Sequence, residues 1–151
     1  MSGGAPAETG LEAIVLEARR TRDFARITEA IPYARFLGID VDVKGDEITT
    51  CMRYRDDLIG NPALPALHGG TLGALLEHAA IFELLWTEEV KPLPKTINVT
   101  VEYLRSARPR DTFARAEITK RGRRVANVYA TAWQDRRDRP MAQAHAHFLL
   151  R

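Results

Sequence analysis

Residues 68–87 read HGGTLGALLEHAAIFELLWT, and this is the most helical and most apolar stretch of the chain. Its apolar side chains surround the expected helix and do not keep to one stripe. They are Leu72, Leu75, Leu76, Ala79, Ala80, Phe82, Leu84 and Leu85. A helix that is apolar nearly all round is normally buried on most of its sides. The stretch therefore predicts a fold in which other elements wrap one long helix over about residues 69–87.

Segments with the two-residue alternation of a β-strand flank this helix on both sides. Upstream, two of them face each other across a turn at Lys44-Gly45-Asp46. Downstream, three or four strands follow, two of them joined by a turn at residues 120–123. The segments are 39–43, 48–54, 97–103, 113–119, 125–133 and 141–150. This order predicts an α+β fold with one antiparallel sheet packed on one helix.

The N-terminal part of the chain has a different pattern. Residues 1–10 are small and polar and are expected to be a flexible start. From Leu11 to Phe36 apolar residues recur at helical spacing and predict one or two short helices. The segment 56–67 holds a glycine, an asparagine and two prolines, which predicts a loop. We expect residues 1–30 to form the flexible start and an N-terminal helical extension, and residues 31–151 to form the main domain.

The composition is that of an ordinary globular protein. With 151 residues, 45% hydrophobic and 28% charged, the chain suits one folded domain. A net charge of only +2, without a face that combines aromatic and basic residues, argues against nucleic-acid binding. The single cysteine, Cys51, cannot form an intrachain disulfide and is expected to be inert packing in a strand. Neither a signal peptide nor a membrane-spanning run is recognised, so we expect a cytoplasmic protein without membrane insertion.

The start of the central helix has the features of a site that polarises a carbonyl group. Two glycines, Gly69 and Gly70, remove Cβ atoms where something must approach the backbone closely. The first N–H groups of a helix are unpaired and lie at the positive end of its dipole. They could stabilise the oxyanion of a tetrahedral intermediate. The alternative, equally open on these residues alone, is a glycine-rich turn in which His68 is a structural hydrogen-bonding residue.

Glu77 is the second candidate, because it lies in the middle of the apolar helix. An ionised carboxylate is costly there unless it is paired, and partial desolvation favours a general base. The alternative is that Glu77 faces solvent or pairs with His78 or with an arginine of the sheet. Glu77 follows Gly70 by seven positions, or about 10 Å along a helix. That spacing predicts a two-fold dimer with the site at its interface, unless the loop folds back.

The run 61–80, with the strands at 96–104 and 115–133, resembles the hotdog thioesterase superfamily. The resemblance is to its phenylacetate (PaaI-like) and 4-hydroxybenzoyl-CoA thioesterase branch and covers about residues 30–151. It implies a hotdog fold, in which an antiparallel sheet wraps one long central helix, with the N-terminal helical piece as an extra segment. It also implies hydrolysis of an acyl-CoA thioester by a homo-oligomer, as a dimer or a dimer of dimers.

The resemblance places four residues in the catalytic site, His68, Gly69, Glu77 and Asn61, and assigns a role to three of them. The backbone N–H of Gly69, which follows His68, would polarise the thioester carbonyl, and Glu77 would act as nucleophile or general base. An Asn or Gln upstream of the histidine helps to hold the thioester or water in this family. The only candidate here is Asn61, which lies seven residues before His68 where six are usual.

Two positions depart from the family pattern. Pro62 stands at the usual place of the amide residue, and Ile81 stands where the Glu-bearing type has a Thr one turn after the acid. These departures keep a second function open, a non-catalytic acyl-CoA-binding or ligand-binding protein on the same fold. The leading hypothesis is a thioesterase for a small or medium acyl-CoA, with aromatic and aliphatic acyl groups both open.

Substrate binding is expected on both sides of the reacting bond. Gly70 and Leu72 would lie beside the acyl group, and exposed arginines would match the phosphates of CoA. The basic stretch 120–124 resembles a Gly-basic turn of the family, although a solvated hairpin tip is the alternative. The arginine candidates are Arg105, Arg121, Arg123 and Arg124, with Arg108 and Arg110 near the first of them.

No metal and no cofactor are expected, since CoA is part of the substrate. His145 and His147 share one face of the last strand, but no third ligand stands at a useful spacing.

Overall fold

The structure of the chain, a computed structural model, describes residues 6–87 and 93–150. The helices and strands follow the predicted order. At least one helix more than predicted precedes the first strand pair, and a short hairpin follows it. Within these residues the elements are α1 (Pro6–Thr21), α2 (Ala25–Ala30), α3 (Pro32–Leu37), β1 (Ile39–Lys44), β2 (Glu47–Met52), the 3-10 turn η1 (Asp56–Leu58), β3 (Ile59–Asn61), β4 (Ala66–Leu67), α4 (Gly69–Thr87), β5 (Lys95–Tyr103), β6 (Thr112–Arg121), β7 (Val125–Trp133) and β8 (Ala142–Leu149).

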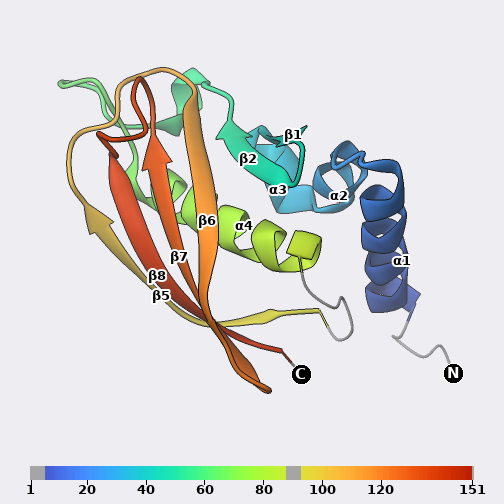
Figure 1. Ribbon diagram of the computed structural model, residues 1–151. Helices are drawn as coiled ribbons and strands as arrows, with labels where there is room; N and C mark the ends of the chain where they lie inside the picture. The colour runs from blue at the N-terminus through green and yellow to red at the C-terminus, as the bar shows by residue number, and fades with distance from the viewer. Residues whose placement is uncertain (1–5, 88–92, 151) are drawn as a thin grey trace, which may run out of the picture.

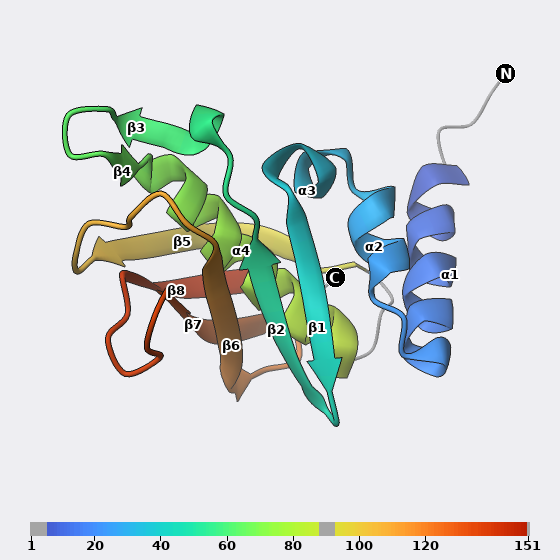
Figure 2. The same cartoon turned by 90° about the horizontal axis from the view of Figure 1, so that it is seen from above.

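One sheet of six strands dominates the molecule, in the order β1-β2-β6-β7-β8-β5. Every neighbouring pair in it is antiparallel. The sheet curves around α4, which packs mainly against β6 and β7 (Figure 1). The helices α1–α3 lie beyond the β1 edge (Figure 2). The predicted α+β hotdog fold, with an antiparallel sheet around one long helix, is confirmed.

Small side chains on the inner face of the sheet let α4 lie close to it. Alternate positions of β7 and β8 are buried, and most of them are alanines. They are Ala126, Val128, Ala130, Ala132, Ala142, Ala144, Ala146 and Phe148. Opposite them α4 buries Leu75, Leu76, Phe82 and Leu84 completely. Each such side chain contributes roughly 1.5–3 kcal/mol on burial, so this contact is a major source of stability.

The N-terminal part holds three helices where one or two were predicted. The first, α1, begins at Pro6, so residues 6–10 are helical and are not part of a flexible start. Residues 1–5 lie outside the described residues. A third helix forms because the helical run breaks at Ile31, whose backbone is extended since Pro32 follows it. Pro32 then opens α3, where its missing N–H costs no hydrogen bond.

The N-terminal helices share a core with the second half of α4. The ring of Phe24 lies 5.0 Å from that of Phe82 and 5.6 Å from that of Trp86. Val15 and Ile27 are fully buried in the same cluster. The domain boundary that we placed after residue 30 stays a prediction.

The segment 56–67, predicted as a loop, contains a short hairpin. The turn η1 leads into β3, which pairs with β4. Strands of three and two residues are too short to show the alternation that predicts a strand. A second difference lies in β6, which runs to Arg121, so that the turn to β7 occupies residues 122–124 and not 120–123.

Four segments that are distant in sequence meet at one end of the sheet, called here the Gly69 end (Figures 1 and 2). They are the start of α4, the β3–β4 hairpin, the β5–β6 loop and the β7–β8 loop. The Leu67 N–H donates to the Ala107 carbonyl at 3.0 Å, and the Leu104 N–H donates to the Met141 carbonyl at 2.9 Å. The opposite end, called the turn end, carries the β6–β7 turn.

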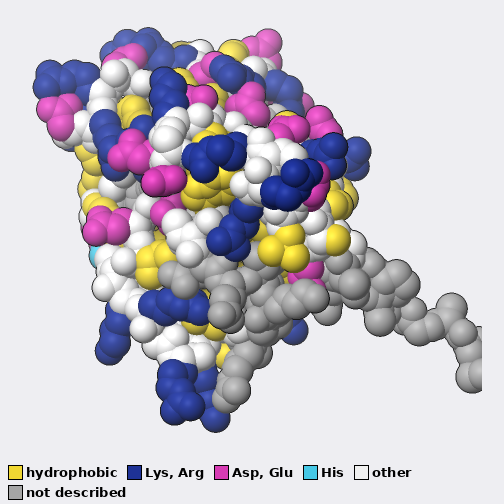
Figure 3. All heavy atoms as spheres, turned by 45° about the vertical axis from the view of Figure 1, so that its right-hand side comes forward, with side chains coloured by type: hydrophobic (Ala, Val, Ile, Leu, Met, Phe, Trp, Pro, Cys, Tyr) yellow, Lys and Arg dark blue, Asp and Glu magenta, His cyan; other side chains and the backbone are white. Residues whose placement is uncertain are grey.

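Positive and negative side chains are interspersed over the face shown in Figure 3. This mixture accords with the net charge of +2. In the described part of the chain, no helix has both the length and the hydrophobicity that spanning a membrane requires.

Candidate active site

His68 closes the first turn of α4 with its own atoms. Its Nδ1 accepts the Gly70 N–H at 2.9 Å, and its carbonyl accepts the Thr71 N–H at 3.0 Å. These are two of the donors that the start of a helix leaves unpaired. For the Gly69 N–H, the structure shows no acceptor among the described residues. The turn therefore combines a structural role for His68 with a Gly69 N–H that is available to a ligand.

Three glycines make this arrangement possible because a Cβ at any of them would crowd a neighbour. At Gly60 it would lie 2.6 Å from Cα of His68, and at Gly70 it would lie 3.0 Å from Nδ1 of His68. At Gly69 it would lie 3.1 Å from Cε1 of Tyr103. The contact at Gly60 is the most severe, because a backbone atom stands in the way. The strand β3 therefore positions His68 through a glycine that the sequence placed only in a loop.

Tyr103, at the end of β5, covers the Gly69 peptide. Its hydroxyl donates to the Gly69 carbonyl at 2.8 Å, while 56% of the residue's surface stays exposed. Tyr103, Gly69, Leu72 and Arg105 are among the residues that line a cavity of about 330 Å³. The structure thus brings three predicted residues together and adds Tyr103. Its only signal in the sequence was a hydroxyl-bearing side chain at the end of an alternating strand.

Glu77 is half-buried on α4 and is held by the strand β5. The Thr96 hydroxyl donates to Oε1 of Glu77 at 2.9 Å. The family pattern places a hydroxyl one helical turn after the acid, at Ile81, whereas here β5 supplies the hydroxyl from Thr96. The alternative pairing of Glu77 with His78 is not observed, since Nδ1 of His78 lies 2.7 Å from the Ala74 carbonyl.

His78 has a structural role. Its ring packs between Tyr33 and Phe82, with centroids 5.8 Å and 5.6 Å away. Burial lowers the pKa of His78, so the imidazole is neutral at pH 7.

The two candidate groups lie well apart within one chain. Glu77 follows Gly69 by eight residues of the continuous helix α4, or about 12 Å. Their partners on β5, Thr96 and Tyr103, are seven residues apart, roughly 20 Å along a strand. Each partner thus anchors one half of the predicted site, and a single copy does not place the carboxylate at the Gly69 cavity.

The sequence profile of the acyl-CoA thioesterase N-terminal domain family matches residues 60–149. The chain belongs to this family. The match starts at Gly60, includes all of α4 with Glu77, and ends at Leu149, the last residue of β8. It confirms the predicted resemblance to the hotdog thioesterases.

Solved structures of similar proteins agree with this assignment. A protein from Chromobacterium violaceum is 37% identical with a TM-score of 0.75, and the alignment covers 91% of this chain and 96% of the other. A putative thioesterase from Ralstonia eutropha JMP134, described as phenylacetic acid degradation-related, is 26% identical with a TM-score of 0.71 and coverages of 83% and 98%. A Bacillus halodurans protein solved with CoA has the same fold at 18% identity, with a TM-score of 0.69 and coverages of 99% and 97%. No curated protein matches the chain.

Asn61, the predicted amide residue of this thioesterase-family site, is the last residue of β3, where the loop of the β3–β4 hairpin begins. Its Oδ1 accepts the Ala63 N–H at 3.0 Å, which is the bond of an Asx turn. The side chain is exposed. Its catalytic role stays a prediction, because this bond turns the oxygen toward its own loop.

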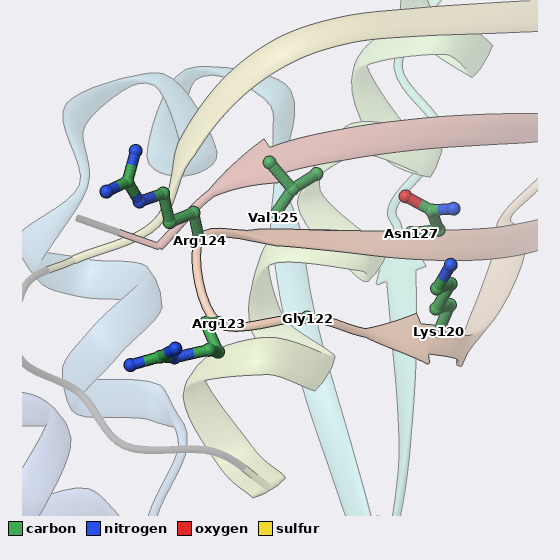
Figure 4. Close-up of a pocket in the computed structure, with 6 residues that line it drawn as sticks. All are labelled: Lys120, Gly122, Arg123, Arg124, Val125 and Asn127. Carbon is green, nitrogen blue, oxygen red and sulfur yellow. The ribbon is translucent and has the colours of Figure 1, made fainter.

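The predicted arginines divide between the two ends of the sheet. Arg105 lies at the Gly69 cavity. Arg123 and Arg124 extend from the turn between β6 and β7, where they help to line a cavity of about 690 Å³ (Figure 4). Arg121 ends β6 beside them. The ten residues of β6 separate the two ends by roughly 30 Å, so one copy does not offer both sets to the Gly69 cavity.

The remaining candidates have structural surroundings. Nδ1 of His147 lies 2.7 Å from Oδ1 of Asn98, and the His145 ring packs on Tyr129. The described residues contain no group of three or more side chains that could hold a metal ion. Cys51 is buried, and burial raises the pKa of its thiol to about 11, which keeps it protonated.

Proposed function

We propose that the protein hydrolyses acyl-CoA thioesters at a site formed by Gly69 and Glu77. The observation that carries the proposal is the Gly69 N–H, which has no acceptor among the described residues and stands at the cavity where α4 starts. A thioester carbonyl there would accept this N–H at the positive end of the helix dipole. Membership of the thioesterase family supports the same chemistry.

The reaction then needs one attack on the carbonyl carbon. As general base, Glu77 takes a proton from water while the water oxygen bonds to that carbon, and the oxyanion is held by the Gly69 N–H. The C–S bond then breaks, and the CoA thiolate takes up the proton to give the free acid and the CoA thiol. As nucleophile, the Glu77 carboxylate attacks the carbonyl carbon, the C–S bond breaks, and the CoA thiolate leaves and takes up a proton. Water then hydrolyses the resulting mixed anhydride, which releases the free acid and regenerates the Glu77 carboxylate.

The site is completed by a second copy of the chain. In the described structure β5 is a sheet edge that pairs only with β8, and Ile97 on it is 52% exposed. A long exposed edge strand is a template for pairing with another chain. If two β5 strands pair antiparallel about Val99, the midpoint of the strand, Thr96 of one copy lies opposite Glu102 of the second. Glu77, whose carboxylate binds Thr96, then lies near Tyr103 and Gly69 of the second copy.

The substrate class follows from the cavity and from the relatives. A cavity of about 330 Å³ beside Leu72 suits the reacting end of a small or medium acyl thioester. The Bacillus halodurans relative was solved with CoA, and the Ralstonia relative is described as phenylacetic acid degradation-related. Both support an acyl-CoA substrate, with an aromatic acyl group among the candidates. A dimer of dimers, a cytoplasmic location and the lack of a cofactor stay predictions.

The test is a panel of aliphatic and aromatic acyl-CoA thioesters with release of free thiol as the readout. Glu77→Gln should lower kcat by about 10²–10⁴-fold while the thioester still binds, because the base or nucleophile is lost. Glu83→Gln, the same change on the same helix, is the matched control and should keep the wild-type rate. Equal activity of wild type and Glu77→Gln would refute the mechanism.

One observation favours the second candidate function, a non-catalytic acyl-CoA-binding protein. Asn61, which would help to hold the thioester or water, is bonded within its own loop. Binding of every thioester in the panel without release of thiol from any of them would support this alternative.

A further inference from the structure

A second cleft of about 400 Å³ lies at the Gly69 end, between the β5–β6 loop and the β7–β8 loop. Four arginines line it: Arg105 and Arg108 from the first loop, and Arg136 and Arg139 from the second. We call it the arginine cleft. Four guanidinium groups on two facing loops are a concentration of positive charge that a chain of net charge +2 shows nowhere else among its described pockets.

The carboxylates near the cleft neutralise only part of this charge, because one of them pairs with a cleft arginine and the other with an arginine outside the lining. Asp135 lines the cleft as well, but it binds Arg110, which is not part of the lining, at 2.5 Å. Asp138 binds Arg136 at 2.6 Å. No carboxylate partner is found for Arg108 or for Arg139 in the described part of the chain, and Arg105 donates through Nε to the Pro140 carbonyl at 3.1 Å. Three guanidinium groups are therefore left to an external anion.

The loop that carries Arg108 is held rigid by a buried amide. Gln134 is only 8% exposed, and its Oε1 accepts the Arg108 N–H at 3.0 Å. Its Nε2 donates to the Arg108 carbonyl at 2.8 Å and lies 3.2 Å from the Thr112 hydroxyl. Fixing the backbone on both sides of Arg108 lowers the entropy that is lost when a ligand binds. The β5–β6 side of the cleft is thus preorganised.

The arginine cleft is continuous with the Gly69 cavity. Arg105 and Ser106 line both, so a ligand in the cleft lies next to the group that would polarise the thioester. We propose that the arginine cleft binds the phosphate groups of a nucleotide-type ligand. Arginine suits this ligand because its planar fork donates two parallel hydrogen bonds to phosphate oxygens. The phosphates belong either to the CoA of the substrate, in which case the inference rests on the proposed function, or to a free nucleotide.

The experiment uses the full chain and adenosine 3′,5′-bisphosphate, which carries nucleotide phosphates without a thioester. Its affinity is measured by calorimetry for the wild type and for the double variant Arg108→Ala/Arg139→Ala. We expect binding to weaken by at least about tenfold, because each charge-assisted hydrogen bond is worth about that factor. The double variant Arg26→Ala/Arg35→Ala, on α2 and α3, removes the same charge elsewhere and should keep the wild-type affinity. Thermal unfolding checks that all variants are folded.

A kinetic arm identifies the source of the phosphates. KM is compared for an acyl-CoA and for the matching N-acetylcysteamine thioester, which has no phosphate. If the Arg108→Ala/Arg139→Ala variant has a higher KM than the wild type for the acyl-CoA alone, the cleft binds the substrate's own CoA. Loss of bisphosphate binding with both KM values unchanged assigns it to a free nucleotide.

The outcomes separate this inference from the proposed function. Wild-type bisphosphate affinity in the Arg108→Ala/Arg139→Ala variant, or the lack of any binding to the wild type, overturns the arginine cleft as a phosphate site. A wild type that binds the bisphosphate through these arginines but hydrolyses no thioester keeps the cleft and overturns the proposed function.

Discussion

The Gly69 end and the turn end of the sheet differ in how they are built. At the Gly69 end, four segments are tied together by backbone hydrogen bonds between residues far apart in sequence. At the turn end, a single tight turn joins β6 to β7, and the Gly122 N–H donates across its base to the Val125 carbonyl at 2.8 Å. The turn end has the larger cavity, about 690 Å³ against about 330 Å³. Among the described residues, the Gly69 end combines a helix start, a peptide held by a tyrosine hydroxyl and a cleft lined by four arginines.

The two ends show that residues close together in sequence need not lie at the same site, and that residues far apart in sequence can. The arginines at 121–124 are the densest basic run of the chain, yet they lie at the end of the sheet opposite Gly69. Arg136 and Arg139, which no motif pointed to, lie beside Arg105 because the β7–β8 loop folds against the β5–β6 loop. The arginines of the turn end reach a Gly69 cavity only if they come from another copy, as with Glu77.

The largest effect of a change at the Gly69 end should come from the glycine that admits His68. Gly60→Ala places a Cβ 2.6 Å from a backbone atom of His68, so the first turn of α4 must shift. We expect thioesterase activity to fall by about 100-fold or more, since the Gly69 N–H is moved from its position. Stability should fall by roughly 1–3 kcal/mol. The matched control is Gly10→Ala, where a Cβ meets nothing within 4 Å. Its activity should stay at the wild-type level, and a wild-type rate for Gly60→Ala would contradict the site.

Mixing two inactive variants sharpens this test. In a two-fold dimer with shared sites, a mixed dimer of Gly60→Ala and Glu77→Gln contains one site that is wild type in both halves. Random pairing of equal amounts after denaturation and refolding should restore about a quarter of the wild-type rate. If the mixture is no more active than its components, Gly69 and Glu77 do not act across two copies.

A smaller effect is expected from the hydroxyl that holds the Gly69 peptide. Tyr103→Phe removes the hydrogen bond to the Gly69 carbonyl and leaves the ring in place. We expect kcat to fall about 3- to 10-fold with little change in KM, because a hydrogen bond of this kind contributes about 1 kcal/mol. Tyr129→Phe removes a comparable bond, to Gln143 on the neighbouring strand, and should leave kcat unchanged. A pure KM effect in Tyr103→Phe would mean that the hydroxyl binds substrate and does not position the peptide.

The smallest effect concerns the stability of the Gly69 end in acid. Hydrogen bonding from the Tyr54 N–H, at 2.7 Å, and from Arg53 lowers the pKa of Asp111. A carboxylate with a depressed pKa stabilises the fold above its unfolded pKa of about 3.9, and this contribution is lost as the pH falls through the folded pKa. Asp111→Asn should therefore lower Tm on the order of a few degrees at pH 7 and by less at pH 3. Asp42→Asn, at an exposed pair with Lys44, is the control. An Asp111→Asn deficit that is the same at both pH values would contradict this account.

The sequence predicts the elements well, because their signals are local. The all-round apolar pattern of residues 69–87 predicts a buried helix, and α4 has those bounds. The glycines after His68 predict a close approach to the backbone, and Tyr103 makes it. Elements that are too short to show a periodic pattern were not predicted, and the two-residue strand β4 is one example.

What the sequence could not predict depends on strand order. β5 follows α4 in the chain but lies at the far edge of the sheet, beside β8. This placement alone brings Thr96 to Glu77 and Tyr103 to Gly69. Alternation predicts that a segment is a strand, yet it carries no information about which strand lies beside it. The partners of both candidate groups are therefore a product of topology.

Gly60 has an evolutionary consequence. A Cβ atom is common to every other amino acid, so position 60 has no conservative substitute while His68 keeps its place 2.6 Å from where that atom would stand. A lineage could lose this glycine only together with the helix start that it faces. Drift at position 60 in related chains should therefore mark members that have abandoned the Gly69 chemistry, even where the rest of the fold persists.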